Sequence, residues 1–285
     1  DALWVENDGV FRELDFDRMK RISWGNKREE EGTTGAFGIG FISVYQITDK
    51  PEIFSSGRHW VFQPDERKIS ESFEEGKNTR FRLPWAFEPT DIRRELGVPP
   101  VNKNNLDEIT DEIAKAVEHA ALFLKQIRLL EVKRSGELIC RIQVERDGDN
   151  LVVQKNNNLV YWKLINGSFN PEAQKIRTKY AGMIEAKRQA SVCLAIPQIP
   201  SQNGLLYAFL PSETDSHLPF HVNADFYPSP NRKNILLDSS YKAEWNRAAI
   251  LCAAVTLAQH LEEIKKIFSP ENPAEFWDFI NTIYA

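Results

Sequence analysis

The sequence of 285 residues has few cysteines, no long apolar run and no low-complexity tract. Its three cysteines, Cys140, Cys193 and Cys252, are odd in number, widely spaced and never arranged as a CxxC pair. Each lies among apolar residues, which favours buried thiols in a reducing compartment over a disulfide framework. No apolar run approaches the ~20 residues that a membrane helix needs, and no secretory signal opens the chain. The sequence therefore predicts a cytoplasmic protein without a membrane span.

The chain also lacks a basic excess. Its 36 lysines and arginines are outnumbered by 41 acidic residues, for a net charge of −5, which argues against an obligate nucleic-acid binder. The basic, helix-prone segment 171–190 has two interpretations: a solvated helix face, which we favour, or a nucleic-acid contact. With 42% hydrophobic and 27% charged residues, the composition is that of a globular protein with one large domain or two ordinary ones.

Glycines number only 14, yet three of them gather with GxxGxG spacing at Gly35, Gly38 and Gly40, directly before an apolar run. Glycine lets a backbone approach a ligand closely, and the first amides of a helix are unpaired and partly positive. This pattern suits a phosphate chain. It differs from the dinucleotide fingerprint, which has a strand before the glycines and an acidic residue about 20 residues later. The charged segment Lys20–Thr34 is instead predicted to be a flexible lid, or in part a solvated loop.

Two further stretches accompany the glycine loop. Upstream, LWVENDGVF (3–11) is a short apolar run that ends in Asn-Asp-Gly, and downstream the run Gly-Lys-Asn-Thr (76–79) precedes RFRLPW. Together with the loop, these stretches resemble the GHKL ATPase superfamily, which includes the ninety-kilodalton heat-shock chaperone, MutL, the gyrase B subunit and histidine kinases. GIGFISVYQITDK is similar to the phosphate loop and helix of the chaperone type, and HAALFLKQIRLLEV (119–132) is similar to a recurring sacsin segment.

The resemblance implies roles for individual residues. A group at the strand end binds the adenine amino group: anchoring the pattern on Gly9 selects Asn7, and anchoring it on the aspartate selects Asp8, which we favour. Thr79 resembles the threonine that closes the adenine pocket. The second glycine of the family motif is replaced at position 10 or 11, so this pocket wall departs from the common form. The predicted phosphate contacts come from the lid and the glycine loop: Lys27, Gly35, Phe37, Gly38, Ile39, Gly40 and Phe41.

Alternating apolar runs between turn residues predict a buried strand at 2–7 and an antiparallel meander at 52–56, 59–63, 69–74 and 79–85, with a helix at 40–48. Prolines and asparagines between 88 and 105 mark a linker. We therefore predict an ATP-binding domain over 1–88, a linker over 89–105 and a transducer-like domain over 106–285. The fold class is α+β: a GHKL α/β sandwich with helices on a mixed, largely antiparallel sheet, followed by a second α/β domain and C-terminal helices.

The second domain is predicted to open with a long amphipathic helix, apolar from Leu106 to Ile127, with strands over 129–165. In GHKL proteins a basic residue of this domain contacts the terminal phosphate. Arg232 and Lys233 lie in a loop rich in proline and asparagine, where such a residue would be presented. Arginine is favoured because its fork makes charge-assisted contacts with phosphate, and the alternative is an ordinary surface loop.

In GHKL ATPases, a helix upstream of the adenine strand carries a glutamate as general base and an asparagine that holds Mg²⁺. The chain opens on what reads as an interior strand, so we expect a preceding segment to supply both groups. We predict an ATP-driven conformational clamp of the chaperone and sacsin type, which is an ATPase if that helix is supplied. The alternatives are a non-hydrolysing scaffold and a DNA-associated clamp like MutL. Besides ATP and Mg²⁺, the expected partners are a protein client, a following domain or a second copy, with nucleic acid less favoured and no membrane.

Overall fold

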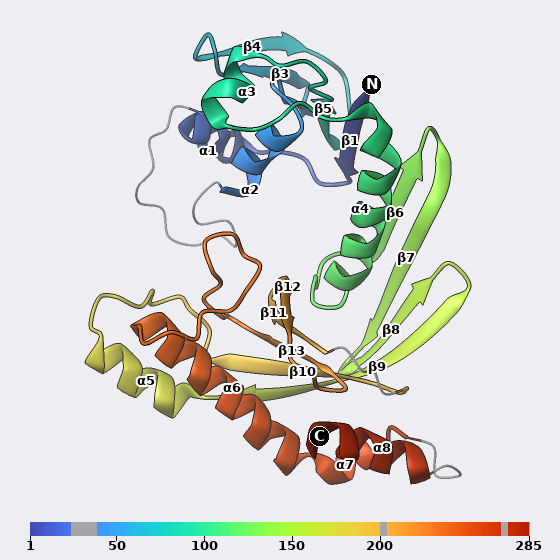
Figure 1. The fold of residues 1–285 in the computed structure, drawn as a ribbon, viewed down its shortest axis with the longest axis vertical. Coiled ribbons are helices and arrows are strands. Elements are labelled where there is room, and N and C mark those ends of the chain that lie inside the picture. The colour runs from blue at the N-terminus through green and yellow to red at the C-terminus, as the bar shows by residue number, and fades with distance from the viewer. Residues whose placement is uncertain (24–38, 200–203, 269–272, 285) are drawn as a thin grey trace. The chain divides into compact units, whose positions relative to one another are not determined.

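The computed structural model describes residues 1–23, 39–199, 204–268 and 273–284. Within these ranges the chain divides into two compact units, Asp1–Asp107 and Glu108–Ala285, and each is described by itself (Figure 1). Both units combine helices with a sheet, so the predicted α+β class is confirmed.

The first unit is built on a five-stranded antiparallel sheet with the strand order β1-β5-β2-β3-β4. The predicted strands all form, but β5 returns to lie between β1 and β2, so the arrangement is not a simple meander. Every residue of β5 is at least partly buried, so this strand suits an interior position. β4 is largely exposed and forms an edge of the sheet. The bounds are β1 Ala2–Asn7, β2 Glu52–Ser55, β3 Arg58–Gln63, β4 Lys68–Phe73 and β5 Thr79–Pro84.

Helices cover one face of this sheet. They are α1 (Glu13–Ser23) and α2 (Ile39–Ile42), which contribute to the core of this layer. The unit also contains the 3-10 helix η1 (Ser43–Gln46) and α3 (Asp91–Leu96). The helix predicted at 40–48 is therefore split between α2 and η1. Successive residues of a strand project to opposite faces, so each strand contributes every second residue to the core. The core of this layer contains Phe16, Met19, Ile53, Trp60 and Phe62.

The segment predicted as a linker, 89–105, folds onto the first unit. Thr90 caps the N-terminus of α3 by accepting from the amide of Arg93, and Gly97 ends the helix with a φ of +65°. The side chain of Arg93 is 1% exposed. A buried arginine needs several partners, and it finds them in the first unit, as described below.

The second unit is built on an eight-stranded sheet with the order β12-β11-β13-β10-β9-β8-β7-β6. All neighbours are antiparallel except β11 and β13, which are parallel, so this sheet is mixed and largely antiparallel. The bounds are β6 Leu129–Arg134, β7 Glu137–Asp147, β8 Asn150–Lys155, β9 Asn158–Ser168, β10 Ser191–Pro197, β11 Leu205–Ala208, β12 Leu210–Asp215 and β13 His221–Ala224.

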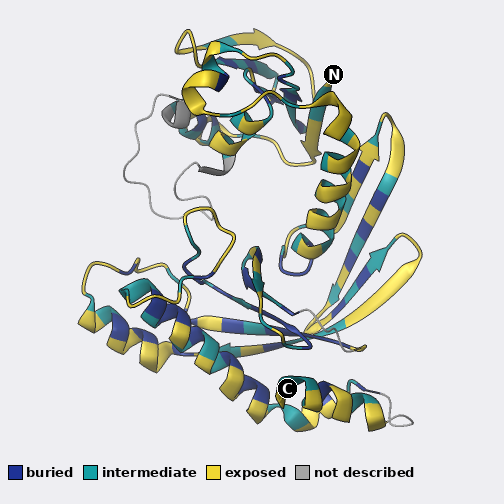
Figure 2. Ribbon diagram, in the orientation of Figure 1, coloured by how far each residue is buried: buried dark blue, intermediate teal, exposed yellow. Residues whose placement is uncertain are grey.

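Helices lie on both faces of the second sheet. α4 (Leu106–Ala120) and the turn that follows it cover one core, and α5 (Asn170–Lys179), α6 (Tyr241–Gln259), α7 (Leu261–Lys265) and α8 (Pro273–Tyr284) cover the other. Figure 2 shows the buried residues of this unit along the strands and on the inner side of α6. The alternation along β10 serves both cores, because Ala195 faces the α4 core while Leu194 and Ile196 face the α6 core.

One predicted element of this unit differs from the structure. The helix expected from Leu106 to Ile127 ends at Ala120, where the guanidinium of Arg146 donates to the carbonyls of Ala121, Leu122 and Leu124. These tertiary bonds satisfy carbonyls that would otherwise require further helix. The segment 218–237 contains β13, which pairs with β10 and β11 in the interior of the sheet.

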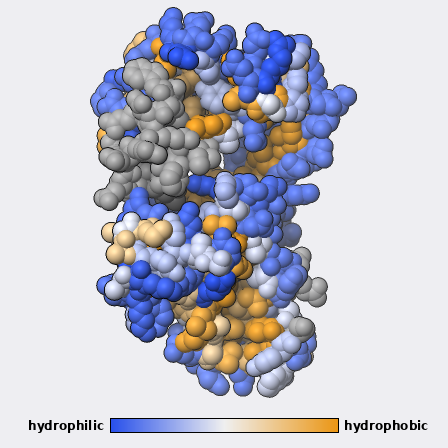
Figure 3. Space-filling view, turned by 60° about the vertical axis from the view of Figure 1, so that its left-hand side comes forward, coloured by the Kyte–Doolittle hydropathy of each residue, from blue (hydrophilic) through white to orange (hydrophobic). Residues whose placement is uncertain are grey.

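Within the described ranges, no helix combines the length and apolar character needed to cross a membrane. Figure 3 shows hydrophobic residues gathered on part of the surface of the second unit. The exposed apolar side chains of that unit include Leu251 and Val255 on α6 and Trp277 on α8.

Candidate functional site

Two strands far apart in the sequence meet at one corner of the first sheet. Asn7, the last residue of β1, pairs with Thr79, the first residue of β5, and the amide of Thr79 donates to the carbonyl of Gly9 at 2.9 Å. Residues opposite each other in an antiparallel pair project to the same face, so Asn7 and Thr79 share one side of the sheet. The two sequence motifs predicted to hold adenine therefore lie together.

A third residue, Ser55 at the end of β2, completes this corner. Its Oγ lies 2.7 Å from Oγ1 of Thr79 and accepts the amide proton of Phe11 at 2.8 Å. Ser55 and Thr79 are 3% and 1% exposed. Sequence reasoning missed Ser55, because a serine at a strand end carries no signal until the strand beside it is known.

Of the two hydroxyl protons of Ser55 and Thr79, one has no hydrogen-bond acceptor among the described residues. Each hydroxyl carries one proton, and their mutual hydrogen bond takes one of the two. Ser55 otherwise acts as an acceptor toward Phe11, and the described residues supply no acceptor for the second proton. An O–H donor left over at a buried position favours a ligand with an acceptor atom next to the pair.

Asn7 and Asp8 differ in where they are placed. Oδ1 of Asn7 lies 3.6 Å from the point that a Cβ at Gly9 would occupy, so the glycine leaves room beside that oxygen. Asp8 follows β1 in an exposed bend, and its carboxylate has no hydrogen bond or ion pair with a described residue. The choice between these two residues as the adenine contact stays a prediction.

The helix that follows the glycine loop lies on the same face of the sheet as this corner. The Phe41 ring of α2 packs against Phe62 and Phe81, with ring centroids 5.1 and 6.5 Å apart. Phe81 is two residues from Thr79 on β5 and therefore projects to the same side as Thr79. Phe41, predicted to contact phosphate, has its side chain in the core, so a ligand contact there would have to come from its backbone.

The remaining predicted phosphate contacts are only partly described. Lys27, Gly35, Phe37 and Gly38 lie outside the described residues, as does most of the predicted lid. Ile39 and Gly40 fall in α2, the helix that follows the glycine loop.

Apolar side chains stand uncovered near the corner. Val5 and Val10 are 50% and 53% exposed. Val5 is paired with Phe81 and so projects to the helix-bearing face. Such surface beside a polar corner suits the flat face of an aromatic ring or a covering apolar segment.

In the second unit, Arg232 and Lys233 belong to a turn that is closed by a bridge between Pro228 and Ile235. Arg232 has a φ of +59°, a left-handed conformation that costs a residue with a side chain roughly 1–2 kcal/mol. Lys233 Nζ pairs with Glu213 at 2.9 Å, which raises the pKa of the lysine. The guanidinium of Arg232 is exposed and has no partner among the described residues. The two predicted residues are therefore not equivalent, and only Arg232 has its charge unpaired.

One buried side chain holds both ends of this turn. Asn246 of α6 is fully buried; its Oδ1 accepts from the amide of Tyr227, and its Nδ2 donates to the carbonyls of Tyr227 and Leu236, all at 2.8 Å. The asparagine bonds the backbone before and after the turn, so it fixes the separation of the two ends and gives Arg232 a rigid base.

A second polar cluster contacts the residues that lead into the turn. Arg188 Nη1 donates to Asp225 Oδ1 at 2.7 Å and its Nε to Glu185 at 2.9 Å, while its guanidinium lies 3.5 Å from the centre of the Tyr227 ring. Burial alone would raise the pKa of Glu185, but the hydrogen bonds from Arg188 and Tyr227 lower it to about 2.

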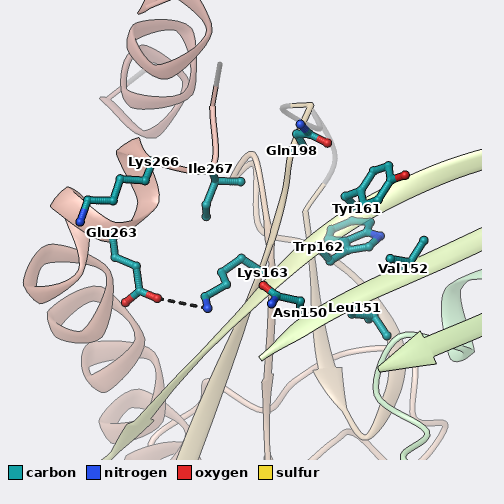
Figure 4. A pocket seen from close by; sticks show the side chains of 10 residues that line it. All are labelled: Asn150, Leu151, Val152, Tyr161, Trp162, Lys163, Gln198, Glu263, Lys266 and Ile267. Atoms are coloured by element: carbon teal, nitrogen blue, oxygen red, sulfur yellow. Dashed lines mark ion pairs between the residues drawn. The ribbon is translucent and has the colours of Figure 1, made fainter. Parts of the chain in front are cut away.

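No group of three histidine, cysteine or acidic side chains among the described residues is arranged to hold a metal ion. A cavity of about 380 Å³ lies in the second unit between β8, β9 and α7 (Figure 4). Lys163 and Glu263 face each other in it at 3.3 Å. None of the predicted site residues lines this cavity.

Comparisons with known proteins point to the first unit. The family model "Sacsin domain" matches residues 1–80. Human Sacsin is 34% identical over 93 residues, which are 33% of this chain and 2% of Sacsin. The chain thus spans a very small share of this curated relative.

A solved structure, the 43K ATPase domain of Thermus thermophilus gyrase B in complex with an aminocoumarin, covers 99% of this chain and 80% of its own. Its identity is 13% and its TM-score is 0.35. This similarity is too weak to describe the fold, which rests on the strands and helices given above. The family match falls on the stretch that holds β1, the glycine loop and the start of β5. The sacsin-type resemblance is confirmed: residues 1–80 match the Sacsin domain model, and part of the chain is similar to human Sacsin.

Proposed function

We propose that the first unit binds ATP, with the adenine at the Asn7–Thr79 corner and the phosphates at the backbone of residues 35–41. The observation that carries this proposal is the common face: Phe41 of α2 packs on Phe81, which lies on the same side of β5 as Thr79. The ends of a nucleotide would then contact two elements of one layer. The Sacsin domain match over residues 1–80 includes Asn7, Thr79 and the glycine loop, and it supports the same assignment.

The chemistry of the corner suits adenine. Adenine offers an acceptor nitrogen next to an amino donor, so it pairs best with one donor and one acceptor held side by side. The unused proton of the Ser55–Thr79 pair supplies the donor, and Oδ1 of Asn7 or the carboxylate of Asp8 supplies the acceptor. The exposed side chain of Val5 adds apolar surface for the ring.

We assign Mg²⁺ and the general base to groups outside the described residues. The described side chains include no arrangement that fits a metal ion, and the resemblance places the metal ligand and the base on a helix upstream of β1. Hydrolysis is therefore proposed to depend on that helix. The same observation favours a second candidate, a scaffold that binds nucleotide without hydrolysing it.

We further propose that the nucleotide drives a conformational clamp. The unpaired charge of Arg232 is the group we assign to recognition of the terminal phosphate, because one added charge-assisted contact distinguishes ATP from ADP. The rigid turn supports this role: a residue that keeps a side chain in a left-handed conformation is more readily explained by a function than by stability.

The test of ATP binding is a titration of the chain with a fluorescent ATP analogue and then with unlabelled ATP in competition. Thr79→Val keeps the shape of the side chain but removes its hydroxyl, and we expect ATP binding to weaken about tenfold. Ser72→Ala on the exposed strand β4 is the matched control and should bind like the unaltered chain. Equal affinity of Thr79→Val and the unaltered chain would contradict the adenine assignment, and no binding at millimolar ATP would contradict the proposed function.

The scaffold candidate is separated from the clamp by a second measurement. With the upstream helix joined to the chain, the clamp predicts ATP turnover and a smaller radius of gyration in ATP than in ADP. Binding without turnover and without compaction would favour the scaffold.

A further inference from the structure

Arg93 of α3 joins two parts of the first unit that lie more than 40 residues apart. Its Nη1 lies 3.1 Å from Oδ1 of Asp49, and its Nη2 donates to the carbonyl of Gln46 at 2.6 Å. Its Nε and Nη2 donate to the carbonyl of Pro99 at 3.0 and 2.6 Å. The other carboxylate oxygen of Asp49 accepts from the hydroxyl of Thr90 at 2.7 Å. One buried guanidinium and one carboxylate therefore hold three backbone segments together.

The segments that meet here are the exit of the glycine-loop helices and the connection to the second unit. Gln46 is the last residue of η1, which directly follows α2. Pro99 begins the stretch that leads to α4 at Leu106. Backbone bonds reinforce the same junction, from the amide of Ala86 to the carbonyl of Ile47 at 2.9 Å and from the amide of Val101 to the carbonyl of Ala86 at 2.8 Å.

Stability alone does not call for a charged residue at this place. Apolar side chains of similar volume often stabilise a core as well as a buried ion pair does, because the pair loses its hydration. A guanidinium adds a directional constraint. Its donors lie in a fixed plane, so their hydrogen bonds form only when Asp49, Gln46 and Pro99 are placed in one particular way. The contact is therefore suited to keeping the end of η1 and the chain at Pro99 in a fixed relation when either one moves.

We propose that Arg93 is a positioning residue that passes the state of the nucleotide site to the chain segment 98–107, and through it to the second unit. This inference rests on the proposed ATP binding. A shift of α2 and η1 on phosphate binding displaces the carbonyl of Gln46, and the rigid guanidinium moves Pro99 with it. The hydrogen-bond network of Arg93 either moves as a unit or breaks. In both cases the position of segment 98–107 changes when nucleotide binds.

The experiment compares neighbouring arginines of the same helix. Arg93→Lys keeps the charge but loses the planar five-donor fork. Arg94→Lys alters an exposed arginine whose ion-pair partner among the described residues is Asp91. Hydrogen exchange of the amides in 98–107 is measured without nucleotide and with saturating ATP. We expect an ATP-dependent change in the unaltered chain and in Arg94→Lys, and its loss in Arg93→Lys, with an ATP affinity that stays within about threefold of the unaltered chain.

Asp49→Asn is the second variant, for use if Arg93→Lys does not fold, and it should lose the same exchange response. A response retained in folded Arg93→Lys or Asp49→Asn would overturn the inference. If the unaltered chain binds ATP but shows no change in 98–107, the inference is overturned while the proposed function stands. If the unaltered chain binds no ATP, both are overturned.

Discussion

The turn that carries Arg232 allows stability and function to be separated at one position. The residue has a φ of +59°, where alanine and arginine meet the same steric conflict between Cβ and the backbone, and glycine meets none. Arg232→Gly and Arg232→Ala remove the same charge. They differ in whether the strain is kept.

The expected difference follows from two opposing effects. Release of left-handed strain stabilises the glycine variant by about 1–2 kcal/mol, and the greater freedom of glycine in the unfolded chain reduces this by about 0.4–1 kcal/mol. The free energy of unfolding should therefore be about 1 kcal/mol higher for Arg232→Gly than for Arg232→Ala. Chemical denaturation of the two variants, compared at equal slope with denaturant, measures this difference.

Function should respond equally in the two variants. If the guanidinium recognises the terminal phosphate, both variants lose one charge-assisted hydrogen bond, worth about 1.5–3 kcal/mol. The preference for ATP over ADP should then fall by a factor on the order of 10–100. Lys233→Ala is the control, because that lysine already pairs with Glu213 and its loss should leave the preference unchanged. An unaltered ATP preference in both Arg232 variants would refute the assignment, and equal stability of the two would refute the strain argument.

Two further predictions concern the core of the second unit. Burial, with a smaller effect from His119, lowers the pKa of His221 to about 4. Its Nδ1 accepts the amide proton of Leu205 at 2.9 Å. The unfolded chain protonates this imidazole near pH 6.5 and the folded chain only near pH 4, so stability should be full above pH 6.5 and fall by up to about 1.4 kcal/mol per pH unit as the pH is lowered between these values. Denaturation at several pH values should show this slope, and a folded His221→Gln variant that kept it would contradict the assignment to His221. Gly167 of β9 packs against α6 so closely that an added Cβ would clash with Thr256 Oγ1 and lie 3.0 Å from its Cβ, so Gly167→Ala should destabilise the protein by about 1–3 kcal/mol. Adding Thr256→Ala should recover part of that loss in a double-mutant cycle, and strictly additive effects of the two changes would contradict the packing argument.

The local pattern of the sequence was sufficient for most of the elements. Alternating residues and turn signals predict β2, β3, β4 and β5 to within a residue or two, because side-chain period and turn chemistry act over short stretches. The Ser-Asp cluster before Tyr241 and the proline at 273 likewise mark where α6 and α8 begin. The family resemblance could be read for the same reason, since its motifs are short and local.

Strand order and helix ends depended on contacts between distant residues. Nothing local places β5 between β1 and β2, and this placement is what brings Thr79 to Asn7 and to Ser55. The end of α4 at Ala120 depends on Arg146, which lies on β7 and is not visible to a pattern of helical spacing. Arg93 reads as one of several charged residues in a linker, and only folding shows that it is buried against Asp49.

By itself, then, the sequence determined which segments are strands and helices and which short motifs they carry, because backbone preference and side-chain alternation are properties of neighbouring residues. The tertiary structure alone decided which hydroxyls meet at the Asn7–Thr79 corner, which of two adjacent cations keeps an unpaired charge, and how a connecting segment is joined to the helix after the glycine loop. Hydrogen bonds and ion pairs act over about 3 Å, and only the folded chain brings residues 20 or more positions apart within that distance.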